Sequence, residues 1–252
     1  RGNLFGRALD YLGFYVAASA KLFGLARRGD IIIAKTDPPL LSVPAAAVAK
    51  LRSACLINWL QDLFPEVARE LGVRGIPYGA LLALRDWSLR VAVRNVVIGE
   101  RMVELLKQRG IPSEQIVHIP NWADGEAIYP IAPADNPLRS EWGLEGKLVI
   151  GYSGNLGRAH EYETLLGAAE KLRDDDDIVF LFIGDGAHIA ALKEHAKAKG
   201  LDNLMFKPYQ PRSELSQSLG VADAHLIILR PELEGLIVPS KYYGIAAAGR
   251  PT

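Results

Sequence analysis

Short apolar runs alternate along the chain with longer segments of helical periodicity. The first half predicts four strands, at 30–34, 54–60, 95–99 and 115–119, and four helices, at 5–28, 40–53, 78–92 and 100–109. The run at 30–34 is rich in β-branched residues, as is typical of a buried parallel strand. Strands that alternate with helices at this spacing predict a parallel sheet with helices on both faces.

The alternation stops at a stretch that contains Pro130, Pro133 and Pro137 and then begins again. The second half predicts strands at 147–153, 178–183, 203–207 and 224–229, and helices at 163–172, 187–199, 213–219 and 240–248. We therefore predict an α/β protein with a Rossmann-like domain at 1–122, a linker at 123–142 and a second Rossmann-like domain at 143–252.

Composition narrows the class of protein. Of 252 residues, 49% are hydrophobic and 23% charged, which is typical of a globular chain rather than a disordered one. The 29 basic and 29 acidic residues cancel, which argues against a nucleic-acid binder. The single cysteine, Cys55, excludes an intrachain disulfide, and the longest uncharged stretch, 38–49, is shorter than a membrane span of about 20 residues. We interpret the acids at 174–177 as a solvated turn rather than a metal site, and we predict no metal.

Ligands of open parallel sheets bind beyond the carboxyl ends of the strands, so the strand-to-helix turns are the candidate sites. The first such turn of the second half holds Gly154, Asn155, Gly157 and Arg158, where glycines allow close approach and backbone N–H groups favour an anion. The next turn, 184–186, lacks the third glycine of a dinucleotide fingerprint. Each turn has a purely structural alternative.

The loop and helix at 232–248 carry the strongest candidate chemistry. An acid and a glycine, Glu234 and Gly235, precede Ser240, which we expect to cap the helix with its side chain. Lys241 follows and can place a positive charge against a phosphate, while the acid can accept from ribose hydroxyls. An acid beside a phosphate cradle favours a sugar nucleotide as ligand.

Six segments in this order resemble bacterial glycosyltransferases of family four: TDPPLLS, NWLQDLFPE, IPNWAD, SGNLG, GDG and ADAHLIILRPELEGLIVPSKYYGIAAAGRP. The resemblance runs over the whole chain and is greatest to the branch that builds exopolysaccharide, colanic-acid-like and O-antigen repeat units. It implies a GT-B fold, with two Rossmann-like domains facing a cleft, the donor nucleotide on the second and the acceptor on the first. It also implies retention of anomeric configuration without a required metal or cofactor.

The chain departs from the family at several positions. Where many members carry an Arg and a Lys that grip the diphosphate, this sequence has Asn155 and His160. The second of two family glutamates falls on Gly244 by counting, which leaves Glu234 as the nearest candidate. A family His-Asp pair is here Gln61-Asp62. The changes at Asn155, His160 and Gly244 keep a non-catalytic interaction domain open as an alternative. A GT-B-type sugar-nucleotide epimerase, with the same fold and no acceptor, is the other alternative.

Turns and resemblance together define the candidate residues. The catalytic candidates are Asp62, Glu234 and Lys241. The donor-side candidates are Gly154, Asn155, Gly157, Arg158, Gly184, Asp185, Gly186, Tyr209, Gly235, Ser240 and Lys241. The acceptor-side candidates are Thr36, Asp37, Gln61, Asp62, Glu100 and Asn121. For Asp62 the structural alternative is a helix N-cap, for 35–39 a simple turn and for Glu100 a helix start.

The expected partners are a nucleotide sugar and a saccharide or lipid-linked acceptor, with no nucleic acid. The helix at 5–28 mixes aromatic with basic residues, and we interpret it first as a core helix of the first domain. Peripheral contact with the inner face of the plasma membrane, as a lipid-linked acceptor would need, is the alternative. The chain lacks the opening Gly-rich strand and the last helices of the family. We therefore expect residues 1–252 alone to be inactive and to aggregate, with donor affinity kept better than turnover.

Overall fold

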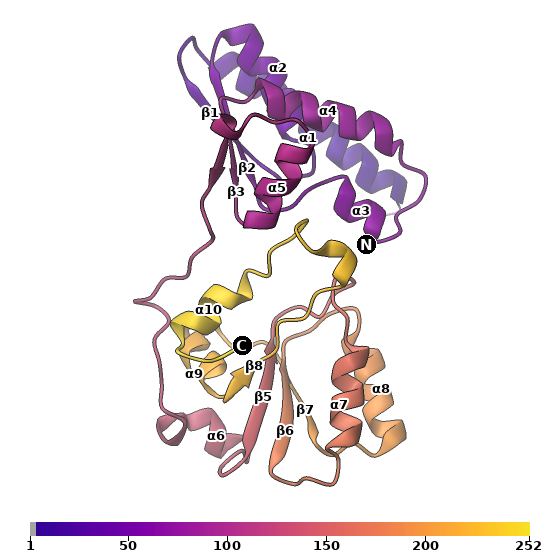
Figure 1. Cartoon of the computed structure of the whole chain (residues 1–252), viewed down its shortest axis with the longest axis vertical. Coiled ribbons are helices and arrows are strands. Elements are labelled where there is room, and N and C mark those ends of the chain that lie inside the picture. Colours follow the sequence, from indigo (N-terminus) through magenta and orange to yellow (C-terminus); the bar gives the residue numbers. More distant parts are fainter. Residues whose placement is uncertain (1–3) are drawn as a thin grey trace. The chain divides into compact units, whose positions relative to one another are not determined.

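Two parallel sheets organise the chain (Figure 1). The computed structural model describes the backbone of residues 4–252 and the side chains from residue 10 onward, so the chain start and the side chains of Phe5 and Arg7 lie outside the described residues. The chain divides into two units, which we describe separately. Unit 1 comprises Arg1–Pro120 and Glu232–Val238, and unit 2 comprises Asn121–Pro231 and Pro239–Thr252.

Unit 1 contains a sheet of four parallel strands in the order β1-β2-β3-β4. Its elements are α1 (Leu4–Leu25), β1 (Ile31–Lys35), α2 (Ser42–Arg52), β2 (Cys55–Leu60), α3 (Glu66–Glu70), α4 (Tyr78–Val91), β3 (Arg94–Val97), α5 (Glu100–Gln108), a 3-10 turn (Ser113–Gln115) and β4 (Ile116–His118). The predicted strands and the long helices are confirmed. The short helix α3 was not predicted, because its five residues carry too little periodicity.

Alanines and a pair of asparagines build the core of unit 1. Ala45, Ala46 and Ala49 of α2 are buried, and small side chains there let the helix lie close to the sheet. Asn58 and Asn95 are register partners on β2 and β3, both fully buried, and Asn58 Nδ2 donates to Asn95 Oδ1 over 2.9 Å. This pair fixes the register of the two strands, because a slip would leave buried amides unpaired.

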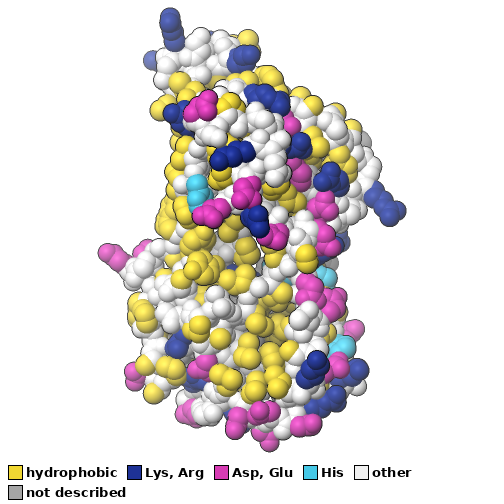
Figure 2. Space-filling model, viewed as in Figure 1, with side chains coloured by type: hydrophobic (Ala, Val, Ile, Leu, Met, Phe, Trp, Pro, Cys, Tyr) yellow, Lys and Arg dark blue, Asp and Glu magenta, His cyan; other side chains and the backbone are white. Residues whose placement is uncertain are grey.

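One edge of the sheet and most of α1 are exposed. Ile31 and Ile33 on the edge strand β1 are 64% and 58% exposed. Along the described part of α1, side chains such as Leu12, Val16 and Leu25 are also exposed, so these residues do not form the core helix that we expected. On the face shown in Figure 2, basic and acidic side chains are interspersed.

Unit 2 has a second parallel sheet, in the order β7-β6-β5-β8. Its elements are α6 (Pro137–Glu141), β5 (Leu148–Ser153), α7 (Glu163–Lys171), β6 (Ile178–Ile183), α8 (Ile189–Lys199), β7 (Leu204–Lys207), α9 (Leu215–Gly220), β8 (Ala224–His225), α10 (Lys241–Ala247) and 3-10 turns at Pro133–Asp135 and Arg212–Glu214. A further 3-10 turn, Pro231–Leu233, begins in unit 2 and ends in unit 1. The alternation is confirmed, but β8 is much shorter than the predicted strand 224–229. After Leu226 the chain leaves the sheet, and Arg230 N–H bonds to Ala159 O instead.

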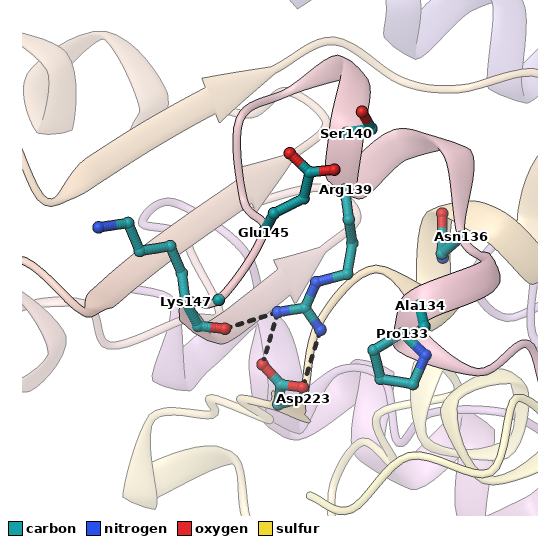
Figure 3. Close-up of a pocket in the computed structure, with 9 residues that line it drawn as sticks. Pro133, Ala134, Asn136, Arg139, Ser140, Glu145, Lys147 and Asp223 are labelled. Carbon is teal, nitrogen blue, oxygen red and sulfur yellow. Dashed lines mark hydrogen bonds and ion pairs between the residues drawn. The ribbon is translucent and has the colours of Figure 1, made fainter.

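The predicted linker at 123–142 is not a free connection. Leu138 and Trp142 are buried in the core of unit 2, and Asn136 caps α6 by accepting from the Leu138 N–H. Arg139 points at Asp223 (Figure 3) and pairs with both of its carboxylate oxygens, at 2.9 and 3.0 Å. The sequence did not predict helix α6, because a helix of about one turn shows no helical period and needs only two apolar side chains to pack it against the core.

The division of the chain also differs from the predicted boundaries. Asn121, predicted to end the first domain, is the first residue of unit 2. The segment Glu232–Val238 lies in unit 1 although both of its flanks lie in unit 2. Its Leu236 O accepts a hydrogen bond of 2.9 Å from the Leu63 N–H, and Ile237 forms an antiparallel bridge with Asp62. We refer to residues 232–238 as the strap.

Candidate active site

Two glycine loops interlock at the carboxyl end of the unit 2 sheet. A Cβ added at Gly184 would lie 2.3 Å from Gly154 O, and one at Gly186 would lie 2.4 Å from Leu156 O. Both glycines also have positive φ, +133° and +147°. The loops after β5 and β6 therefore pack backbone against backbone, which only glycine allows, and they present their main chains to a ligand.

Lys241 lies beneath the first of these loops. Its Nζ is 3.6 Å from the centre of the Tyr152 ring and would be 3.5 Å from a Cβ at Gly154. Nζ is buried and has no hydrogen-bond partner among the described residues. Burial lowers the pKa of Lys241 to about 8. A cation held here without a counter-charge strongly favours an anionic ligand.

Tyr152 and two histidines complete the surroundings of Lys241. Tyr152 is almost fully buried, its hydroxyl donates to Asn155 O over 3.0 Å, and burial followed by the neighbouring Tyr209 raises its pKa, so it stays neutral. Burial, more than the charge of Lys241, lowers the pKa of His160 and of His225. Both histidines are therefore neutral near pH 7, and Lys241 supplies the buried positive charge.

The remaining donor-side candidates lie on the same loops or beside them. Asn155 and Arg158 are exposed on the loop after β5, and His160 Nδ1 lies 3.1 and 3.0 Å from Gly157 N and O. A pocket of about 490 Å³ follows β6 and β7 and is lined by Gly184, Asp185, Ile189, Lys193, Phe206, Lys207, Pro208 and Tyr209. The Tyr209 side chain is 56% exposed, so its ring is available to stack on a planar group.

One prediction on the last loop, the side-chain cap at Ser240, needs correction. Ser240 precedes α10, but its side chain makes no capping hydrogen bond, because its own backbone is already helical (φ −64°, ψ −20°). Glu234 and Gly235 lie in unit 1, where the Glu234 carboxylate is 3.5 Å from Arg101 Nε. A side chain at Gly244 would point at Leu219 and Ile128, so the counted glutamate position faces apolar side chains.

On unit 1, the acceptor-side candidates gather where β1 and β2 end. Thr36 Oγ1 accepts from the Gln61 N–H over 3.1 Å. Burial, and after it the charge of Asp37, raises the pKa of Asp62, while a hydrogen bond to Thr36 opposes the shift. Helix α3 begins at Glu66 after Pro65, so the N-cap alternative for Asp62 is wrong. Glu100, by contrast, is the first residue of α5, as its structural alternative proposed.

A buried charge network on unit 1 was not among the predicted candidates. Arg85 is 4% exposed, pairs with Glu66 and bonds Asp86 Oδ1 over 2.9 Å, and Arg109 reaches Glu66 over 3.3 Å. It lines a pocket of about 400 Å³ with Arg69 and the strap. Neither Arg85 nor Tyr152 stands out in the sequence, because each lies inside an ordinary helix or strand pattern.

The described residues hold no helix that is long and apolar enough to cross a membrane. Within the same part of the chain, no group of three or more His, Cys, Asp and Glu residues is placed to hold a metal ion.

Relatives with known names match the chain. Residues 135–238 match the family model of glycosyl transferases group 1. WbjE of Pseudomonas aeruginosa, named as a probable glycosyltransferase, is 33% identical over 259 residues, which cover 100% of this chain and 63% of WbjE. WcaI of Escherichia coli K12, named for colanic acid biosynthesis, is 30% identical over 220 residues, which cover 84% of this chain and 54% of WcaI.

Solved structures show the same fold. HepE of Anabaena, crystallised with UDP, matches with a TM-score of 0.74 at 16% identity and covers 95% of this chain and 62% of HepE. The fold is therefore that of the GT-B glycosyltransferases. Residues 135–238 are thus similar to the group 1 glycosyltransferases, and the chain spans 63% and 54% of the length of the two curated relatives.

Proposed function

We propose that the protein is a retaining glycosyltransferase that moves a sugar from a UDP-sugar to a saccharide or lipid-linked acceptor during cell-surface polysaccharide synthesis. The observation that carries the proposal is the buried Lys241 ammonium, which has no hydrogen-bond partner among the described residues and lies under glycine-only loops. HepE, whose structures contain UDP and UDP-glucose, and the names of WbjE and WcaI support the class of donor and of product.

In this proposal the donor diphosphate pairs with Lys241 and with the backbone of the loops at 154–158 and 184–186. Burial of the ammonium costs free energy in the empty site, and an anionic ligand recovers that cost on binding. Arg158 on the exposed loop adds charge, Asp185 and Ser240 add polar contacts, and the uracil ring stacks on Tyr209 in the neighbouring pocket.

The chemistry follows from stabilising the leaving group. The bond between the anomeric carbon and the diphosphate oxygen breaks, and the acceptor oxygen bonds to that carbon on the same face. The acceptor proton passes to the departing phosphate oxygen, so the step balances without a carboxylate nucleophile. Lys241 neutralises the charge that develops on the diphosphate, where fixed charges contribute most. We propose that no metal and no other cofactor takes part.

We place the acceptor at Asp62, with Thr36, Asp37 and Gln61 beside it, where carboxylates can orient sugar hydroxyls. The exposed aromatic residues Tyr11, Phe14 and Phe23 on α1, together with Lys21, suit peripheral contact with a membrane. We therefore propose that the protein works at the cytoplasmic face of the plasma membrane, where a lipid-linked acceptor would be presented.

The test is UDP binding by calorimetry with the full-length protein, followed by a screen of UDP-, GDP- and dTDP-sugars for transfer. We expect Lys241→Met to weaken UDP binding strongly and to abolish transfer, whereas Lys197→Met, on the exposed face of α8, leaves both intact. If Lys241→Met binds UDP like the wild type, the assignment is wrong. An epimerised sugar formed from donor alone would favour the epimerase instead, and no nucleotide binding would favour a non-catalytic domain.

A further inference from the structure

A pocket of about 400 Å³ lies on unit 1, next to the acceptor-side candidates. Its lining comes from α3, α4, the end of α5 and the strap, all of them in unit 1. Leu63, which follows Asp62 in the chain, lines it, and Arg85 lines both this pocket and the small cavity that holds Asp62 and Thr36. A volume of this size is typical of small-molecule sites, which measure about 300–1,000 Å³.

The charges that line the pocket favour a neutral ligand. Four glutamates line it, Glu66, Glu70, Glu232 and Glu234, against three arginines. The acids therefore exceed the bases, and a phosphate or carboxylate group would be repelled. Leucine side chains lie between these charged groups in the lining, which suits a ligand that combines polar groups with apolar ring carbons.

Two buried polar atoms in the lining have no hydrogen-bond partner among the residues that the structure describes. They are Arg85 Nη1, a donor, and Glu66 Oε2, an acceptor. Arg85 is 4% exposed, and its other nitrogens are engaged, Nε with Asp86 Oδ1 over 2.9 Å and Nη2 with Glu66. Unpaired buried groups of this kind cost free energy. A hydroxyl can accept from the first atom and donate to the second, whereas an ammonium only donates and an ionised phosphate oxygen only accepts.

Arg109 is held less tightly than Arg85 in the same charge network. It is 32% exposed, and its guanidinium lies 3.3 Å from Glu66 Oε1 and 3.6 Å from Asp86 Oδ2. Partly exposed ion pairs at such distances contribute little to stability, so the Arg109 side chain can turn outward at small cost. Because Arg109 lines the pocket and contacts Glu66, such a turn widens the pocket toward the two unpaired atoms.

We propose that this pocket binds a neutral sugar unit of the acceptor, next to the unit that Asp62 orients. Arg85 and Glu66 share one hydroxyl group of this sugar after Arg109 turns outward. Arg69, which is 56% exposed at the rim, donates to a further hydroxyl, and the leucines pack against the ring carbons. The acceptor role rests on the proposed function, whereas the binding of a neutral sugar does not.

The test titrates the full-length protein with the methyl glycosides of glucose, galactose, mannose and N-acetylglucosamine, followed by saturation-transfer NMR. We expect at least one glycoside to bind saturably and inorganic phosphate not to displace it. Arg69→Ala removes the donor at the rim and should weaken binding by about tenfold, as expected for one lost hydrogen bond to a charged group. Arg74→Ala is the matched control, because Arg74 is exposed and lies outside the lining.

A second pair of variants blocks the pocket without touching its charges. Gln108 is the exposed last residue of α5 and lines the pocket, so the larger side chain of Gln108→Trp should fill it and abolish glycoside binding. Lys107→Trp places the same side chain at the neighbouring exposed position, outside the lining, and should bind like the wild type. In the transfer screen, Gln108→Trp should raise the KM for the acceptor and leave the KM for the UDP-sugar unchanged.

The outcomes separate this inference from the proposed function. Binding of none of the four glycosides, displacement by phosphate, or equal affinity of Gln108→Trp and Lys107→Trp would each overturn the sugar site. If Lys241→Met binds UDP normally, the proposed function fails while sugar binding by the pocket stands. If UDP binding depends on Lys241 and Gln108→Trp leaves the acceptor KM unchanged, the acceptor role of the pocket alone is wrong.

Discussion

The ammonium of Lys241 lies 3.6 Å from the centre of the Tyr152 ring, and the aromatic face is its main electrostatic contact. A ring quadrupole offsets only part of the cost of a desolvated ammonium, so the pKa of Lys241 falls to about 8. An anion that binds in this site raises the pKa of Lys241 again, so that the ammonium is fully protonated in the complex.

The pH dependence of UDP affinity follows from this pKa. UDP binds the protonated form of Lys241, so affinity is full below about pH 8 and falls as the pH rises through that value, by up to about tenfold per unit. Calorimetry between pH 7 and 10 measures the fall. Lys241→Met should show weak binding without it, and a wild-type affinity that stays flat to pH 10 would contradict the prediction.

The same pKa predicts that the stability of the empty protein changes with pH in the opposite direction to UDP affinity. The pKa of Lys241 is depressed in the folded state, from 10.5 to about 8, so between these values the unfolded chain binds more protons. Stability should therefore rise with pH in that window. Urea unfolding of wild type against Lys241→Met tests this, because the variant should be the more stable of the two at pH 7 and lack the rise.

The interlocked glycines give a prediction for the donor loops. Gly184→Ala and Gly186→Ala each place a methyl against backbone at positive φ, and we expect a loss of about 1–3 kcal/mol of stability with loss of UDP affinity. Gly167→Ala is the control. Gly167 lies inside α7 with open space at its Cβ, so the alanine should stabilise the protein by about 0.5–1 kcal/mol.

Two ion pairs of unit 1 should differ sharply in their effect on unfolding. Arg85→Ala removes the buried partner of Glu66 and Asp86, and we expect a loss of about 3–5 kcal/mol because the acids are left in a poorly solvated place. Arg101→Ala breaks an exposed pair with Glu234 and should change stability little. Chemical denaturation of both variants measures the contrast, and equal losses would refute it.

The sequence predicted the alternation of strands and helices well, because runs such as 178–183 are apolar throughout and are bounded by turns. The prediction was wrong at positions where a long-range contact determines the structure. Trp142 was assigned to a linker because nothing local shows the core that receives it, and Leu226 was assigned to a strand that the chain leaves at that point. Tertiary packing, rather than periodicity, determines both.

The residues of the candidate site also fall into those that the sequence predicts and those that it does not. The glycines and Lys241 could be predicted because their chemistry is local, a tight turn and a charge at a helix start. The crossing of the strap into unit 1 could not, because Glu234 and Gly235 follow a strand of unit 2 and nothing in their own sequence pairs them with Arg101. Tyr152 was missed since a tyrosine in an apolar strand is usually core.

The acceptor side gives the last prediction, which concerns Asp62 and Asp37. Burial is the main cause that raises the pKa of Asp62, and the negative charge of Asp37 is the next. If ionised Asp62 orients the acceptor, transfer should fall at acidic pH as Asp62 takes up a proton.

Asp37→Asn removes the negative charge beside Asp62 and leaves its burial unchanged, so the pKa of Asp62 should fall and the acidic limb of kcat/KM should move to lower pH. Asp62→Asn should lose most of the transfer at every pH while UDP affinity stays normal, because the donor loops lie in unit 2. Profiles of kcat/KM for the wild type and both variants of the full-length protein measure this, and an acidic limb that Asp37→Asn leaves in place would remove Asp62 from the acceptor site.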